Sequence, residues 1–93
     1  MIAIHKFPLR LVGQQDVPMP VDSNIISVQL QNGVPTIWAE VSAEDDTPVS
    51  LQRFLIVGTG DCSLGLYKER EHLATLQMQD GLVWHIYQIF PQH

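Results

Sequence analysis

Residues 27–34 read Ser-Val-Gln-Leu-Gln-Asn-Gly-Val and residues 75–82 read Thr-Leu-Gln-Met-Gln-Asp-Gly-Leu, so one short pattern occurs twice. Each copy places Asn-Gly or Asp-Gly between runs that carry apolar residues at every second position. Such a dipeptide tolerates the positive φ angles of a type I′ turn and is the strongest short-range signal for a β-hairpin. The sequence therefore predicts two hairpins with two-residue loops. The repetition suits a duplicated unit, and convergence on a short strand-turn-strand pattern is the alternative.

The two-residue loop fixes the register of the first hairpin. It places Val28 opposite Ile37 and Ile26 opposite Ala39, so that one face is apolar. The other face, which carries Trp38, is mostly polar. Agreement between turn chemistry and face polarity is what specifies a strand register.

The second hairpin extends over 73–90, and the same rule places His85 opposite Leu76 and His72 opposite Ile89. Its return strand is nearly all apolar and rich in residues that favour strands. We expect a central strand between two layers, or a strand whose second face meets another subunit.

Further segments complete the predicted sheets. Residues 2–7 form a strand that ends at Pro8 or lies at an edge, and 17–21 is an edge segment because its two prolines lack an N–H. Residues 51–57 become apolar on both faces, which predicts a central strand covered on both sides. Residues 66–72 form two turns of helix or lead into the next strand.

These elements predict one all-β, mainly antiparallel domain over residues 1–93. We expect a small β-sandwich or a partly open barrel of about six strands, with at most one short helix.

The charge balance argues against a nucleic-acid partner. Ten acidic residues oppose five basic ones, for a net charge of −5, and the Lys and Arg residues that phosphate binding needs are scattered. Cys62 is the only cysteine, so no internal disulfide is possible, and no stretch approaches the roughly 18 apolar residues of a membrane span. We expect a cytoplasmic protein with no membrane partner. Its charged fraction of 16% favours a homo-oligomer or a bound partner protein.

The loop Gly58-Thr59-Gly60-Asp61 follows an apolar strand and is a candidate ligand site, because successive backbone N–H groups can cradle an anion. The dinucleotide fingerprint fails at Ser63, where Gly or Ala belongs, and the chain has no Gly-Lys-Ser or Gly-Lys-Thr of a P-loop. Asp61 would also repel a phosphate. The alternative is a strand-ending turn whose glycines supply positive φ.

No residue pattern indicates catalysis or metal binding. The four histidines lack the spacing of a zinc site, and we expect His85 to be a buried imidazole with one hydrogen bond. A nucleophile needs a base and an orienting group, and nothing in the sequence links Cys62 to His72 or His85. We therefore expect no enzymatic activity, no metal and no cofactor.

Trp38 is a second candidate contact residue, on the polar face of the first hairpin. Tryptophan is enriched among the residues that dominate binding energy at interfaces. Trp38 either anchors a partner or is covered by a helix or a second sheet.

The order of motifs along the chain resembles a known family. The elements are His5-Lys6-Phe7-Pro8-Leu9, Val17-Pro18-Met19-Pro20, Ile26-Ser27-Val28-Gln29, Gly33-Val34-Pro35-Thr36-Ile37-Trp38-Ala39, Phe54-Leu55-Ile56-Val57-Gly58-Thr59-Gly60 and Gly81-Leu82-Val83-Trp84-His85-Ile86. Over residues 4–87 the chain resembles short proteins of unknown function encoded by bacteriophages, prophages and their bacterial hosts. The Val-Gly-Thr-Gly and Val-Trp-His elements are the most specific, and 61–72 departs from the usual spacing. The resemblance implies a phage context, and it supplies no catalytic residues that could be carried over.

The expected function is that of a non-enzymatic accessory protein that binds a host or phage protein, such as a host defence factor that it inhibits. A minor structural or assembly protein of the virion is one alternative. A small-molecule or nucleotide binder that uses residues 58–61 is the other.

Overall fold

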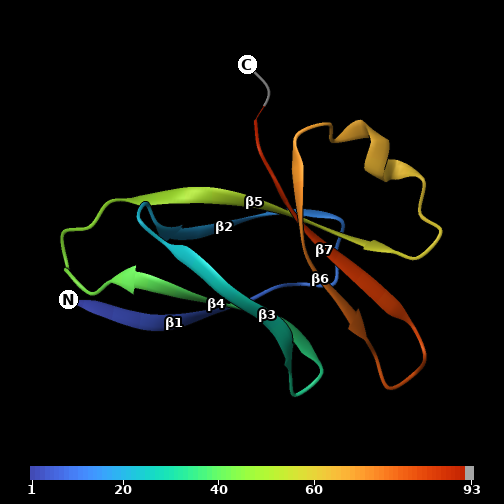
Figure 1. Cartoon of the computed structure of the whole chain (residues 1–93), viewed down its shortest axis with the longest axis horizontal. Coiled ribbons are helices and arrows are strands. Elements are labelled where there is room, and N and C mark those ends of the chain that lie inside the picture. Colours follow the sequence, from blue (N-terminus) through green and yellow to red (C-terminus); the bar gives the residue numbers. More distant parts are fainter. Residues whose placement is uncertain (92–93) are drawn as a thin grey trace.

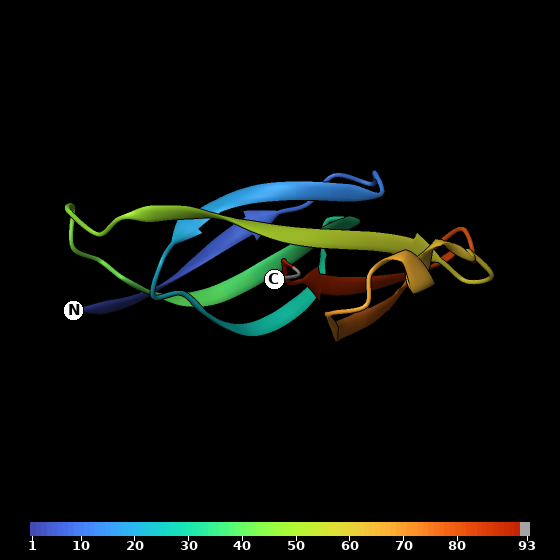
Figure 2. The same cartoon turned by 90° about the horizontal axis from the view of Figure 1, so that it is seen from above.

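The chain folds into two antiparallel sheets (Figure 1). The computed structural model describes residues 1–91, and its elements are β1 (Ile2–Pro8), β2 (Gln14–Pro20), β3 (Asn24–Gln31), β4 (Val34–Ser42), β5 (Val49–Gly58), the 3-10 helix η1 (Ser63–Leu66), β6 (Arg70–Gln77) and β7 (Val83–Ile89). One sheet has the strand order β1-β4-β3 and the other β2-β5-β7-β6. The sheets lie in two layers and do not close into a barrel (Figure 2). The predicted all-β class is confirmed, as an open sandwich with seven strands rather than about six.

The main core lies between the two sheets. The four-stranded sheet contributes Phe54, Ile56 and Ile86, and the three-stranded sheet contributes Ile37 and Ala39. Other buried members of this cluster are Leu9, Met19, Val28, Val41 and Leu76. Because each Å² of buried apolar surface contributes about 25 cal/mol, this layer is the main source of stability.

The central strand β5 is buried on both faces over residues 54–57, where its sequence is apolar on both faces, whereas its first half is largely exposed. On its outer face, Leu55 and Val57 form a second apolar cluster with Ile89. The segment around η1 folds over this cluster and packs Leu64 and Tyr67 against it. In the described part of the chain, no helix has the length and apolar character needed to cross a membrane.

Both proline-containing segments are edge strands, as expected. The strand β1 includes Pro8 and pairs with β4, and β2 pairs with β5. The strand β2 begins at Gln14, earlier than the predicted 17–21 segment. Of the two alternatives for residues 66–72, the structure shows a lead-in to the next strand rather than two turns of helix, because η1 ends at Leu66 and β6 begins at Arg70.

The first hairpin has the predicted two-residue loop. Asn32 and Gly33 have φ angles of 51° and 80°, as a type I′ turn requires. Val28 lies opposite Ile37, which confirms the predicted register next to the loop.

Farther from the loop, a β-bulge changes the register of the first hairpin. The shift lies between Ile25 and Ser27, so that Ile25 lies opposite Ala39. The prediction that Ile26 takes this place was wrong, because a bulge inserts one extra residue into a strand. Ile25 packs against the core, whereas Ile26 is 48% exposed.

The second hairpin has a different loop from the predicted one. The Met78 N–H donates to the Leu82 carbonyl at 2.8 Å, and the Gly81 N–H donates to the Met78 carbonyl at 3.1 Å. Gly81 has a φ of 89°, while Asp80 is not among the residues with positive φ. The loop therefore has three residues, a type I turn followed by a left-handed glycine.

This longer loop moves the register of the second hairpin. His85 lies opposite Thr75 instead of Leu76, and His72 lies opposite Tyr87 instead of Ile89. At His72, part of the register change comes from a further β-bulge, which lies between His72 and Ala74. The predicted pairings were wrong because Asp-Gly fits both two-residue and three-residue loops.

Candidate functional site

The 58–61 loop borders a hollow on the outer face of the four-stranded sheet. The hollow has a volume of about 230 Å³ and is lined by this loop together with Val57, Leu64, His85 and Tyr87. Since β7 lies next to β5 in this sheet, the observed register brings His85 to the candidate loop.

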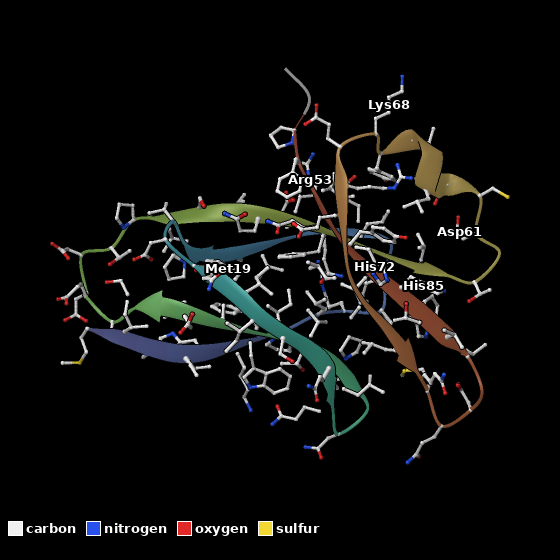
Figure 3. All side chains as sticks on the ribbon, viewed as in Figure 1. Met19, Arg53, Asp61, Lys68, His72 and His85 are labelled. Carbon is white, nitrogen blue, oxygen red and sulfur yellow. The ribbon has the colours of Figure 1, made fainter. Side chains whose placement is uncertain are left out.

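Four side chains beside the hollow form a continuous hydrogen-bonded chain. His85 Nε2 lies 2.8 Å from Thr59 Oγ1, and His85 Nδ1 lies 3.0 Å from Thr75 Oγ1. The same Thr75 Oγ1 lies 3.0 Å from His72 Nε2. Figure 3 shows His72 and His85 close together on neighbouring strands. His85 is thus half-buried with both ring nitrogens paired, rather than buried with the single hydrogen bond that we expected.

The hydroxyl of Thr75 couples the two imidazole rings, because it has one proton to donate. When Thr75 donates to His85, it accepts from His72, and the Nε2–H of His85 then donates to Thr59. The opposite polarity begins with the Thr59 hydroxyl and ends on His72 Nε2. Each ring in this chain bonds to hydroxyls, whereas the imidazole of a catalytic triad is oriented by a carboxylate.

The 58–61 loop is a tight turn whose last residue carries an ionised side chain. The Asp61 N–H donates to the Gly58 carbonyl at 3.1 Å, and Gly60 alone in the loop has a positive φ, 93°. Hydrogen bonds from the Ser63 side chain and backbone N–H lower the pKa of Asp61 below its ordinary value of 3.8. The loop therefore presents a carboxylate to solvent, which opposes phosphate binding.

Two of the backbone donors that an anion would need are already paired. The Thr59 N–H donates to the Val83 carbonyl at 3.4 Å, in addition to the Asp61 bond within the turn. The exposed thiol of Cys62 bonds to the Gly60 carbonyl rather than to either histidine. Among residues 1–91, no group of three or more His, Cys, Asp or Glu side chains is placed to hold a metal ion.

Trp38 lies on the outer face of the three-stranded sheet. Strand pairing places it between Lys6 of β1 and Ser27 of β3, and the exposed side chains of Ile2 and Ile4 share this face. The one helical element in the described residues, η1, packs against the other sheet, so no described helix or sheet covers the outer face of β4, on which Trp38 lies. Its role as a contact residue stays a prediction.

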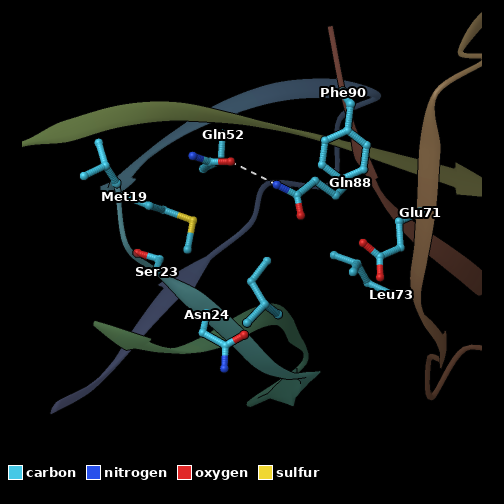
Figure 4. Close-up of a pocket in the computed structure, with 10 residues that line it drawn as sticks. Met19, Ser23, Asn24, Gln52, Glu71, Leu73, Gln88 and Phe90 are labelled. Carbon is cyan, nitrogen blue, oxygen red and sulfur yellow. Dashed lines mark hydrogen bonds between the residues drawn. The ribbon is translucent and has the colours of Figure 1, made fainter. Parts of the chain in front are cut away.

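A second opening lies between β3 and the β6–β7 hairpin (Figure 4). It has a volume of about 360 Å³, and its lining includes Met19, Glu71, Gln52 and Gln88. Gln88 Nε2 donates to Gln52 Oε1 at 2.9 Å, and Gln52 Nε2 donates to Ser50 Oγ at 2.8 Å. These two bonds hold the Gln52 and Gln88 amides against the wall of the opening and occupy one donor of each.

The predicted contact residues thus fall into two separate places, the 58–61 loop on one sheet and Trp38 on the other. The sequence did not predict that Thr75 and His72 accompany His85. The sequence did contain a signal for this grouping, because the register that puts Thr75 opposite His85 gathers polar side chains on one face.

Comparison with protein families matched residues 1–92 to one family model, described as Domain of unknown function (DUF7352). The chain belongs to this family. No curated protein and no solved structure matched the chain. DUF7352 is an uncharacterised family, which confirms the sequence-based expectation of a family of unknown function.

Proposed function

We propose that this chain is a non-enzymatic phage or prophage accessory protein that binds a protein in the host cytoplasm. Its binding surface in this proposal is the outer face of the three-stranded sheet. The observation that supports it is Trp38, which is half-buried on a sheet face that no described element covers. The side chains of Ile2 and Ile4, 66% and 59% exposed, extend the apolar area beside it. An apolar centre with an aromatic anchor and a polar rim is the usual anatomy of a protein interface.

The charges around this face indicate the chemistry of the partner. Glu40 Oε1 accepts from Asn24, Asp22 Oδ1 accepts from the Ser42 N–H, and Glu44 pairs with the terminal amine at 3.2 Å. These carboxylates lie at one end of the sheet in a protein with a net charge of −5. A partner with an apolar patch bordered by Lys and Arg would complement them, and a host defence factor inhibited by this contact fits the proposed phage context.

The test begins with affinity capture from host lysate, followed by titration of the purified partner. We expect Trp38→Ala to weaken binding roughly thirtyfold, since truncating an anchor of this kind costs about 2 kcal/mol or more. The matched control is Leu51→Ala, because Leu51 is 65% exposed on the other sheet. Equal affinity of Trp38→Ala and the wild type would reject the proposed surface, and failure to capture any specific host protein would reject the proposed function.

The hollow beside the 58–61 loop favours a second candidate function, the binding of a small molecule. Its volume of about 230 Å³ is below the roughly 300–1,000 Å³ of drug-sized sites, so only a small neutral ligand would fit, and its polar groups would have to replace the Thr59–His85 hydrogen bond. The Asp61 carboxylate argues against a nucleotide. A thermal-shift screen should then show stabilisation by neutral compounds that is lost in Thr59→Val, and no stabilisation by any compound would discard this candidate.

A further inference from the structure

The four edge strands of this protein differ in how they resist pairing with another chain. An edge strand exposes unpaired N–H and C=O groups, which proteins usually protect with prolines, bulges or charges. Within the described chain, β2 has Pro18 and Pro20, and β3 and β6 each contain a bulge. By contrast, β1 pairs with β4 in an unbroken register from Ile2 to Pro8. No strand of the described residues pairs with its other side, which leaves β1 as the one regular edge among these four.

The hydrogen bonds next to β1 show which of its backbone groups face this free edge. The Leu9 N–H donates to the Pro35 carbonyl of β4 at 2.8 Å. Since the pairs of an antiparallel ladder alternate, the odd-numbered residues of β1 point toward β4. The N–H and C=O groups of Ile2, Ile4 and Lys6 therefore point away from the sheet, and so does the C=O of Pro8.

The same alternation shows that β2 has fewer backbone donors at its free edge than β1 has. The Val21 N–H donates to the Pro48 carbonyl at 2.9 Å, so odd-numbered residues of β2 point toward β5. Pro18 and Pro20 then occupy positions whose N–H would face the free edge. The prolines remove those donors and protect half of β2, whereas β1 keeps its donors up to Pro8.

We propose that β1 is a self-association site, at which two copies of this chain pair β1 against β1 in antiparallel orientation across a two-fold axis. In the register centred on Ile4, Ile4 lies opposite Ile4 of the second copy, and Ile2 lies opposite Lys6. The N–H and C=O groups of all three residues then form hydrogen bonds, while Pro8 stays outside the new ladder. The two three-stranded sheets become one six-stranded sheet.

The side chains of β1 support a second copy as the occupant, because they are complementary to themselves. The central contact is apolar, and each Ile2 packs on the aliphatic stem of Lys6 from the other copy, so that no like charges face each other. On the inner side of the sheet, Ala3 lies opposite His5. A register centred on His5 would instead oppose two imidazoles and bring Pro8 into the ladder.

This dimer does not depend on the proposed function, because edge pairing uses the backbone of β1 and leaves Trp38 uncovered, although the Ile2 and Ile4 side chains border both surfaces. Closed two-fold pairing is also the commonest form of homo-oligomer. The two proposals therefore fail independently: Trp38→Ala should leave the dimer intact.

The decisive experiment places opposite charges at the symmetric position. Because Ile4 meets its own copy, Ile4→Asp and Ile4→Lys should each be monomeric in sedimentation velocity at concentrations where the wild type is dimeric. An equimolar mixture of the two variants should form a one-to-one dimer. Ile4 is 59% exposed, so both variants should fold, and Leu51→Lys on the other sheet is the control that should dimerise like the wild type.

A second measurement needs no variant. The amide protons of Ile4 and Lys6 should exchange with solvent at least tenfold more slowly as the protein concentration rises from about 1 µM to about 1 mM, while those of Ala3 and His5 stay protected throughout. Exchange at Ile4 and Lys6 that is independent of concentration would overturn the proposal. So would a monomeric wild type over this range, or a mixture of charged variants that remains monomeric.

Discussion

The register of the second hairpin can be tested by an engineered disulfide between Thr75 and His85. Met78 and Leu82 form a hydrogen-bonded pair, so Thr75 and His85, three positions farther on, form a non-hydrogen-bonded pair. Such pairs have Cα atoms about 4.5 Å apart, within the range of disulfide geometry. In a Cys62→Ser background, Thr75→Cys with His85→Cys should therefore oxidise readily to one intramolecular disulfide.

The size of the expected stabilisation follows from the length of the loop that this disulfide closes. A loop of about 11 residues loses chain entropy worth about 2.8 kcal/mol in the unfolded state, which is the expected stabilisation of the oxidised form over its own reduced form. For a domain of this size, that corresponds to a rise in Tm of roughly 10–20 °C. Comparing oxidised and reduced forms of one protein removes the effect of losing the Thr75–His85 hydrogen bond.

The control pair is Leu76→Cys with His85→Cys, which the two-residue loop would place opposite each other. In the structure Leu76 belongs to the main core and His85 lies on the outer face, so this pair should not form a disulfide. Mass spectrometry and urea unfolding with and without reductant measure both pairs. Faster oxidation of the Leu76 pair than of the Thr75 pair would refute the three-residue loop. It would also refute the series of hydrogen-bonded side chains beside the hollow.

Three further outcomes are expected. Gly33→Ala should lower the free energy of unfolding by about 1 kcal/mol because its φ is 80°, whereas Gly13→Ala, with open space and no positive φ, should not destabilise the protein in thermal unfolding. Phe54→Ala should cost about 3–5 kcal/mol in urea unfolding, since Phe54 has no exposed surface and the space it leaves is large. Ser63 lowers the pKa of Asp61, so the resulting stabilisation over Asp61→Asn should be complete above pH 3.8 and decline as the pH falls through the lowered value. A difference that grows on acidification would contradict this assignment.

The two hairpins show how far the sequence alone determines this fold. Asn32-Gly33 fits a type I′ turn so well that the loop and the adjoining register were predicted correctly. Asp80-Gly81 permits two loops, and the choice between them depends on tertiary packing. The observed loop lets Leu76 and Trp84 lie opposite each other on the core side, which the two-residue loop would not allow.

The bulges and the candidate site were harder to predict for related reasons. Nothing in the alternation around Ile26 announces an extra residue, because Ile25 and Ile26 are equally suited to the core. The loop at 58–61 was found from its glycines, which require a turn. The neighbours of His85 depend on the register of β6 against β7, so they could not be predicted correctly from a two-residue loop.

The order of the strands in the three-stranded sheet has a consequence for biosynthesis. The strand β1 leaves the ribosome well before its partner β4, and at translation rates of 5–20 residues per second the interval is about 2–7 s. The β3–β4 hairpin then closes within microseconds and captures β1 on its open side. Until that moment a nascent chain displays β1 with both edges unsatisfied, and the other chains on the same polysome pass through the same stage in turn. Codons that slow elongation across 34–42 would lengthen this interval and favour premature association between chains of the same message.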